Sequence, residues 1–239
     1  YIVGLGQNIN VMSDQSPTKM QKTQPSLKLY YFNLPGKAEP IRLACAYSGL
    51  KLDDVRLTFP EFRAKKEAGF FKLGQVPCLE VDGKHQLVQS AAILRYIGKL
   101  GGLYPTNDIE AALVDTVLDA EQDMFSSLHV MRYSARFGFA DILQDRDQPD
   151  DVKAINAENR KTVFARLNSE FYPRHLTNLE TIMQQGGTGW CAGTTSPTIA
   201  DFVLAIRLPW LVCDENPDID STLLDTHPNL KALRQKLQD

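Results

Sequence analysis

The feature that most constrains this chain is a change in its apolar pattern just after residue 103. Before that point, short β-prone runs alternate with helical stretches in the order strand–helix–strand–helix–strand–strand–helix. After it, only long helical periodicities occur. A sheet covered by helices and a bundle of helices are different layer architectures, and each has its own way of burying apolar faces. The sequence therefore predicts two domains, the first α/β and the second all-helical.

Local signals place the elements of the first domain. We expect strands at residues 27–32, 54–59, 76–81 and 85–88, and helices at residues 37–48, 59–68 and 91–100. Pro40 lies early in the first helix and Gly49 lies just after it, the usual order for the start and stop of a helix. Asp82-Gly83 is typical of a hairpin turn, and Ser90 is typical of a residue that caps the helix after it.

The second part of the chain carries helical periodicities over residues 111–140, 151–185, 198–212 and 229–239. Thr198 followed by Asp201 predicts a capping box at the start of the third of these helices. We therefore assign residues 27–103 to the α/β domain, 104–108 to a linker and 109–239 to the helical domain. The sequence ends inside a helical pattern without a stop signal, which predicts a helical domain truncated at its C-terminus.

Residues 1–26 differ from the rest of the chain. An apolar start without a basic segment is a poor signal peptide. The polar stretch after it is rich in Gln, Ser, Thr and Lys, so we expect a disordered extension. The sequence does not begin with Met, and it leaves open whether Met12 or Met20 is the natural start.

Charge and cysteine usage argue against several classes of function. The formal net charge is −3 and the pI is about 5.8, whereas dedicated nucleic-acid binders are usually basic. No run of 18 apolar residues occurs, so we expect no membrane-spanning helix. The cysteines form neither a C-x-x-C pair nor a metal-ligand pattern with histidine, which indicates buried thiols in a reducing compartment and no metal site.

The histidines have no convergent partners in the sequence, and we interpret them as surface or core residues: His85, His129, His175 and His227.

Three short segments of the first domain carry groups suited to binding a peptide-like thiol. Tyr30 and Tyr31 end a strand that leads into a helix N-terminus, where a phenol and free N–H groups together can hold a thiolate. Val76 precedes a proline that cannot donate to a sheet, so its backbone can pair with an extended ligand. Ser90 begins a helix whose first N–H groups can bind a carboxylate. Each segment alone also fits an ordinary structural role, as buried tyrosines, a strand start and a helix cap.

Together these segments resemble a known family. The runs YYFNLPGKAEPIRLACAYSGL and GQVPCLEVDGKHQLVQSAAILRYIGKLGGLYP are similar to the thioredoxin-like domain of cytosolic glutathione transferases. The runs EAALVDTVLDAEQD and SPTIADF are similar to segments of their helical domain. The resemblance covers residues 27–239 and is most specific at QVP and QSAAI. It is closest to the tyrosine-type classes sigma, pi, mu and alpha.

The resemblance implies roles for individual residues. Tyr31, not Tyr30, matches the catalytic tyrosine, and alternation along a strand points the two side chains to opposite faces. Further matches are glutathione-binding positions: Lys37 beside the tyrosine, Gln75, Val76 at the cysteinyl unit, the cis-proline Pro77, Gln89 and Ser90 at the γ-glutamyl carboxylate, and Asp123, which crosses a dimer interface to the γ-glutamyl amine. Leu34 and Tyr133 match positions in the pocket for the electrophile.

The chain departs from the family pattern at the glycyl end of glutathione. Relatives have a Trp and a Lys before the QVP segment, whereas this chain reads FPEFRAKKEAGFFKLG. Phe59 is the candidate for the place of the Trp, and Arg63, Lys65 or Lys66 for the place of the Lys. Lys37 also stands where many relatives have an arginine, which keeps the charge but loses the planar fork.

The implied function is that of a cytoplasmic glutathione transferase, which conjugates the glutathione thiolate to hydrophobic electrophiles and serves in detoxification. Glutathione is a cosubstrate, and no cofactor or metal is implied. The expected assembly is a homodimer, with neither a nucleic-acid nor a membrane partner. Two alternatives keep the fold: a non-catalytic structural or binding protein, and a glutathione-dependent prostaglandin-type isomerase. A cysteine-type thiol–disulfide enzyme would need a Cys after the first strand, and residues 30–36 contain none.

Overall fold

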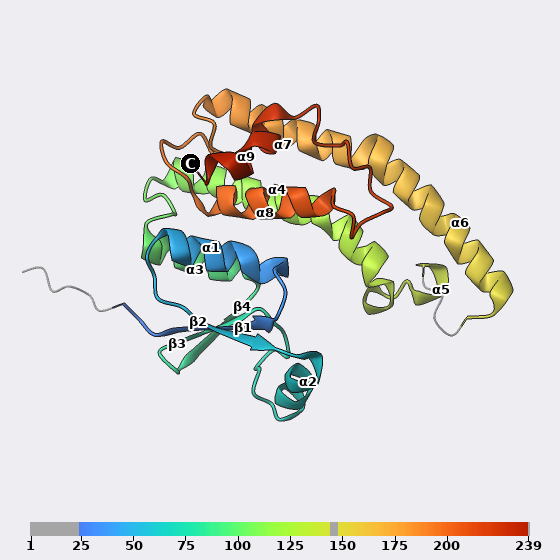
Figure 1. The fold of residues 1–239 in the computed structure, drawn as a ribbon, viewed down its shortest axis with the longest axis horizontal. Helices are drawn as coiled ribbons and strands as arrows, with labels where there is room; N and C mark the ends of the chain where they lie inside the picture. The colour runs from blue at the N-terminus through green and yellow to red at the C-terminus, as the bar shows by residue number, and fades with distance from the viewer. Residues whose placement is uncertain (1–23, 144–147, 239) are drawn as a thin grey trace, which may run out of the picture.

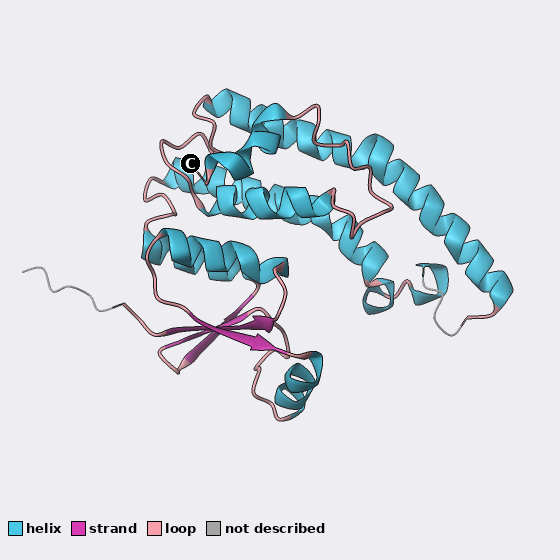
Figure 2. Cartoon of the chain, in the orientation of Figure 1, coloured by secondary structure: helices cyan, strands magenta, loops and turns pink. Residues whose placement is uncertain are grey.

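The computed structural model of the chain describes residues 24–143 and 148–238. One mixed sheet lies below several layers of helices (Figures 1 and 2). The strands are β1 (Leu27–Phe32), β2 (Asp53–Leu57), β3 (Cys78–Val81) and β4 (His85–Val88). Their order in the sheet is β2-β1-β3-β4; β1 and β2 are parallel, and the other neighbours are antiparallel. The predicted α/β organisation of this part of the chain is confirmed.

The two faces of the sheet are covered by different helices. α1 (Glu39–Tyr47) and α3 (Ser90–Gly101) lie side by side on one face, and α2 (Phe59–Glu67) packs on the other (Figure 1). Alternation along β1 places Leu29 and Tyr31 in the core under α1 and α3. Tyr30 belongs to a separate cluster on the opposite face, with Leu57 and Phe71. The predicted opposite orientation of the two tyrosines is therefore present.

The second part of the chain is all-helical over its described residues. Its helices are α4 (Asp108–Arg132), α5 (Ala140–Leu143), α6 (Asp150–Arg166), α7 (Tyr172–Gly186), α8 (Ile199–Leu211) and α9 (Pro228–Lys236). α8 packs against both α1 and α4, so the two parts of the chain share one continuous core. α5 and the start of α6 project away from the sheet (Figure 1). None of the described helices is both long and apolar enough to cross a membrane.

Several expected boundaries in the first domain shift by a few residues, each for a local reason. Thr58 ends the second strand because its side chain caps α2 together with Glu61. The third strand begins at Cys78, two positions later than expected, because the prolyl nitrogen before it has no hydrogen to donate. Gln89, not Ser90, is the N-cap of α3, and Ser90 is the first residue inside that helix.

In the helical part, two expected single helices are interrupted. The first starts at Asp108 because the Asn107 side chain caps it, and it ends at Arg132. A 3₁₀ turn (Ser134–Phe137) and Gly138, with φ of 81°, separate it from α5. The second runs as α6, a π-helical turn (Leu167–Phe171) and α7. Pro173, two residues after the π turn, has no N–H for the regular helical ladder.

The predicted capping box at the start of α8 is confirmed. The Asp201 carboxylate accepts hydrogen bonds from the Thr198 N–H at 2.7 Å and the Thr198 hydroxyl at 2.9 Å. It also accepts the Cys191 N–H at 2.7 Å, and the Asp201 side chain is fully buried. This carboxylate therefore ties the loop before α8 to the helix and has a structural role.

The predicted N-terminal extension lies mostly outside the described residues, which begin at Gln24. The Gln24 side chain exchanges two hydrogen bonds with the Lys51 backbone. Ser26 pairs with Asp82 through both backbone and side chain. The chain thus makes its first described contacts with the fold just before β1, inside the last residues of the segment expected to be disordered.

Candidate functional site

Tyr31 lies at the carboxyl end of β1, next to the start of the following helical segment. Its hydroxyl oxygen accepts a hydrogen bond from the Lys37 N–H at 3.2 Å, and the side chain is only 9% exposed. Burial raises the pKa of the Tyr31 phenol above its ordinary value. The phenol is therefore protonated at neutral pH. Because a phenol oxygen can accept one hydrogen bond while its O–H donates another, that proton is available to a ligand.

The close approach of the Tyr31 hydroxyl to the backbone depends on Gly36. Gly36 has a φ of +44°, in the left-handed region that side chains disfavour. A Cβ atom at this position would lie 2.5 Å from the Tyr31 Oη. The predicted turn before the first helix therefore requires glycine for two reasons, its conformation and the space for the phenol.

Arg42 supports the same loop and was not singled out from the sequence. Its Nη1 donates to the Leu34 carbonyl and to the Glu39 carboxylate, each at 3.0 Å. Its Nε donates to the Asp54 carboxylate at 3.1 Å. The guanidinium lies 5.9 Å from the centre of the Tyr31 ring. Arg42 thus fixes the loop that carries Leu34, and its guanidinium lies beside the Tyr31 ring.

Two further predicted segments have the backbone geometry expected of a ligand site. The Val76–Pro77 peptide bond is cis, and both residues precede β3, so the Val76 backbone lies outside the strand ladder. Gln89 has a φ of 70°, which is uncommon for a residue with a side chain. Its Nε2 donates to the Gln75 Oε1 at 3.4 Å. Left-handed backbone at a residue with a side chain, as at Gln89, is concentrated at functional sites.

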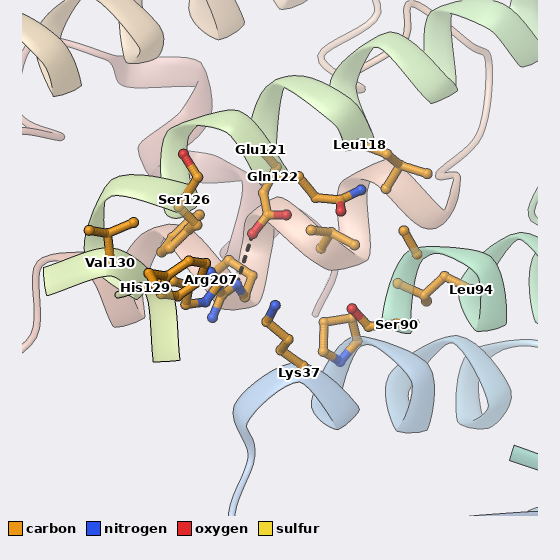
Figure 3. Close-up of a pocket in the computed structure, with 15 residues that line it drawn as sticks. Lys37, Ser90, Leu94, Leu118, Glu121, Gln122, Ser126, His129, Val130 and Arg207 are labelled. Atoms are coloured by element: carbon orange, nitrogen blue, oxygen red, sulfur yellow. Dashed lines mark hydrogen bonds and ion pairs between the residues drawn. The ribbon is translucent and has the colours of Figure 1, made fainter. Parts of the chain in front are cut away.

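A cavity of about 240 Å³ lies between α1 and α3 on one side and α4 and α8 on the other (Figure 3). Of the predicted site residues, Lys37 and Ser90 line it. Its helical wall contributes Glu121 and His129 from α4 and Arg207 from α8. The backbone of Lys37 contacts the Tyr31 hydroxyl, so the cavity adjoins the phenol.

The helical wall of the cavity is charged. Arg207 Nε donates to Glu121 Oε1 at 2.8 Å, and both side chains are more than nine-tenths buried. The Arg207 guanidinium also lies 3.9 Å from the centre of the Phe125 ring. Desolvation, followed by the charges of Lys37 and Arg207, lowers the pKa of His129 to about 4, so this imidazole is neutral at neutral pH. Desolvation and then Arg207 also lower the pKa of Lys37.

Sequence reasoning missed this charged wall. Glu121 and Arg207 are 86 residues apart in the chain, and no local motif joins them. His129 was interpreted as an ordinary surface or core histidine, but it lines the cavity. A charged residue within the apolar pattern of the α8 segment was the one available signal, since a buried arginine requires a partner.

Ten of the twelve predicted site residues, Tyr31 among them, do not line the cavity. Phe59 is 65% exposed at the start of α2, with its ring 4.5 Å from that of Phe32. Arg63 is exposed on α2, and Asp123 is exposed on α4. Leu34 and Tyr133, expected in the electrophile pocket, are 39% and 57% exposed in the loop after β1 and at the end of α4.

The structure shows no grouping of ligands for a metal. No group of three or more His, Cys, Asp or Glu side chains in the described part of the chain could hold a metal ion. Burial raises the pKa of Cys45 to about 12 and that of Cys78 to about 11, so neither thiol ionises near neutral pH.

Comparisons with known proteins agree on one family. The family model for the glutathione S-transferase N-terminal domain matches residues 27–99, and the model for the C-terminal domain matches residues 152–239. A glutathione S-transferase of Anopheles gambiae is 34% identical over 215 residues, which are 90% of this chain and 92% of that protein. Human hematopoietic prostaglandin D synthase is 32% identical over 219 residues, 90% of this chain and 91% of that protein. The solved structure of prostaglandin synthase D of Nilaparvata lugens matches with a TM-score of 0.69 at 28% identity, over 89% of this chain and 92% of that one.

Proposed function

Since the chain belongs to the glutathione S-transferase family, we propose that it ionises the thiol of glutathione at Tyr31 and conjugates the thiolate to an electrophilic small molecule. The observation that carries the proposal is the Tyr31 phenol, which is buried, protonated and held by the Lys37 N–H beside a helix start. In this proposal residues 27–103 bind glutathione and residues 109–239 supply the wall of the electrophile pocket.

The proposed role of Tyr31 is energetically sufficient. A free thiol has a pKa of about 8.5, and lowering it by about two units requires roughly 2.7 kcal/mol of selective stabilisation of the thiolate. One hydrogen bond to a charged acceptor contributes about 1.5–3 kcal/mol. The Tyr31 hydroxyl, helped by the N–H groups of the helix start, therefore supplies enough. The thiolate then attacks the electrophile and forms the carbon–sulfur bond.

The rest of glutathione is proposed to lie along the sheet edge next to Tyr31. The Val76 backbone, free of the ladder, pairs with the cysteinyl unit. Gln75, Gln89 and the first turn of α3 at Ser90 bind the γ-glutamyl carboxylate. Phe59 and Arg63 on α2 remain the candidates for the glycyl end, and their exposure leaves both free to contact a ligand.

The proposed assembly is a homodimer in which Asp123 reaches the glutathione of the partner. Its exposure on α4 supports this role, because a residue that acts across an interface must be exposed in the single chain. Sedimentation analysis should give a dimer, and Asp123→Asn should weaken glutathione binding. A fully active monomer would remove Asp123 from the site.

The proposed function is tested by glutathione binding and thiol ionisation. The purified chain should bind to immobilised glutathione and elute with the free tripeptide. The ultraviolet absorbance of the bound thiolate should titrate with an apparent pKa below 8.5, the approximate value of a free thiol. A folded protein that shows neither property would support the alternative of a non-catalytic structural or binding protein.

A second candidate function is a glutathione-dependent prostaglandin-type isomerase. It is favoured by the 32% identity to the human synthase and by the structural match to the insect synthase. The two functions differ in stoichiometry, since a transferase consumes one glutathione per turnover and an isomerase consumes none. Measuring the glutathione consumed per molecule of prostaglandin endoperoxide converted therefore separates them.

A further inference from the structure

Arg207 presents unused hydrogen-bond donors to the cavity. The residue is 6% exposed, and its Nε is occupied by Glu121. Within the described residues, neither Nη atom of Arg207 makes a hydrogen bond. Arg42 Nη2 is the one side-chain nitrogen or oxygen there that is fully enclosed without a partner, so the Arg207 Nη atoms are not fully enclosed. Since Arg207 lines the cavity, its Nη donors remain open to the cavity interior.

The cavity also holds more positive than negative charge. Lys37 extends into it from the sheet side, opposite Arg207 (Figure 3). Glu121 supplies one carboxylate against these two cations, and the His129 imidazole is neutral at neutral pH. Desolvation and then nearby positive charges, Arg207 among them, lower the pKa of both Lys37 and His129, which agrees with cations lying close together in the cavity wall. An anion would therefore be attracted to the cavity.

The remaining wall mixes the polar residues Ser90, Gln122 and Ser126 with an apolar surface that suits the body of a small organic molecule. Pro40, Leu94, Leu118, Phe125 and Val203 line the cavity. Ser90 and Lys37 are both lining residues and belong to the proposed glutathione site, so the cavity lies next to that site. A molecule bound here would thus contact both an apolar surface and the Arg207 guanidinium.

We propose that this cavity selects electrophiles that carry a carboxylate, which the Nη atoms of Arg207 bind while the reactive carbon faces the glutathione sulfur. This inference rests on the proposed function and narrows it to acidic substrates. Arg207 is suited to the role because a guanidinium can donate two parallel hydrogen bonds to a carboxylate. Its contact with Glu121 through Nε fixes the guanidinium in place.

The reaction needs no further reactant when the electrophile is an unsaturated ketone. The thiolate sulfur forms a bond to the β-carbon, and the electrons of the carbon–carbon double bond move onto the ketone oxygen. The resulting enolate takes a proton from water at the α-carbon. The carboxylate on Arg207 is unchanged and serves only to position the molecule.

The test compares 4-(3-oxobut-1-enyl)benzoate with its primary carboxamide, each rate divided by that of the uncatalysed addition of glutathione. The wild-type enzyme should prefer the acid, in kcat/KM, by about tenfold to a hundredfold, as expected for a charge-assisted hydrogen bond. Equal rates would overturn this inference and leave the proposed function standing. No turnover of either compound would overturn both.

Two variants locate the preference. Glu121→Gln removes the competing carboxylate but keeps Arg207, so the acid-to-amide ratio should rise severalfold. Glu121→Gln combined with Arg207→Gln leaves no unpaired charge, and the ratio should fall to about one. Arg166→Gln removes an exposed cation on α6 outside the cavity lining and should change the ratio less than about twofold. The inference is wrong if Glu121→Gln does not raise the ratio, or if the double variant slows both compounds equally, which would mean that Arg207 acts on the thiolate.

Discussion

The two walls of the cavity are built in different ways. On the sheet side, Tyr31 at the end of β1 and Gly36 and Lys37 in the turn after it are close in sequence, and a backbone N–H holds the phenol. On the helical side, Glu121 on α4 and Arg207 on α8 are 86 residues apart, and a buried ion pair joins them. The sheet wall offers a phenol, backbone N–H groups and the Lys37 side chain, whereas the helical wall offers the buried ion pair. In the proposed reaction the first wall prepares the thiol and the second selects the electrophile.

The largest expected effect is on the stability of the helical wall. Arg207→Leu leaves the Glu121 carboxylate buried without its partner, which should lower the free energy of unfolding by about 3–5 kcal/mol. Urea denaturation measures the change. The double variant Glu121→Gln/Arg207→Gln should lose much less. Lys153→Ala removes an exposed ion pair with Asp150 and should cost less than about 1 kcal/mol. A loss no larger for Arg207→Leu than for Lys153→Ala would show that the pair does not organise this wall.

The next effect is on the chemistry of the sheet wall. Tyr31→Phe removes one hydroxyl and keeps the ring, so the bound thiol should regain a higher pKa. Turnover at neutral pH should fall by about ten- to a hundredfold, since each 1.36 kcal/mol changes a rate tenfold. Tyr30→Phe is the matched control, because Tyr30 packs in the separate cluster on the opposite face of the sheet. If Tyr30→Phe shifts the thiolate titration and Tyr31→Phe does not, the assignment of the catalytic tyrosine is wrong.

A smaller effect should follow from crowding the phenol. In Gly36→Ala the new methyl group would meet the Tyr31 hydroxyl at 2.5 Å and displace it, so turnover should fall by about tenfold. Gly83→Ala is the control for backbone strain, since Gly83 also has a positive φ but has nothing within 4 Å of the added atom. Both variants should lose about 1–2 kcal/mol of stability. Only Gly36→Ala should lose activity. Equal turnover in the two variants would mean that the position of the Tyr31 hydroxyl does not matter for the reaction.

The smallest effect concerns pH and the helical wall. The pKa of His129 is about 4 in the folded chain, below its ordinary value near 6.5, because desolvation and nearby cations disfavour its charged form. Between these values the unfolded chain binds more protons, so stability should fall as pH drops from about 6.5 to 4. With solvent screening we expect His129 to contribute about 1 kcal/mol to this loss. Thermal denaturation against pH should show a shallower slope for His129→Gln than for a His85→Gln control. Equal slopes would contradict the assignment.

The sheet wall could be predicted from the sequence because its signals are local. The run from Leu27 to Gly49 contains a β-prone strand, a turn glycine and a helix with an early proline, and each appears where expected. The predicted boundaries are wrong by one or two residues where a backbone donor is missing or is taken by a cap, as at the start of β3. At α3, Gln89 with its positive φ holds the cap position expected for Ser90. Such conformations are imposed by the surrounding structure and leave no mark in the composition of the segment.

The helical wall could not be predicted because its contacts are made between distant elements. Helical periodicity identified the segments that form α4 and α8, but it did not identify which face of α4 contacts which face of α8. Arg207 and Glu121 were therefore overlooked, while Leu34 and Tyr133 were expected to form the electrophile pocket. The helical boundaries also depended on single residues, as Asn107 and Gly138 show.

The π-helical turn between α6 and α7 has a consequence in terms of rotation. One residue of an α-helix corresponds to about 100° around its axis, so one extra residue in the turn rotates everything before it relative to everything after it. α7 can therefore bury Leu176, Leu179 and Met183 while α6, which runs into it through the turn, buries Phe164 and Asn156. Removing one residue between Leu167 and Phe171 would keep the helices continuous but rotate their buried faces out of phase, so that only one of them could face the core.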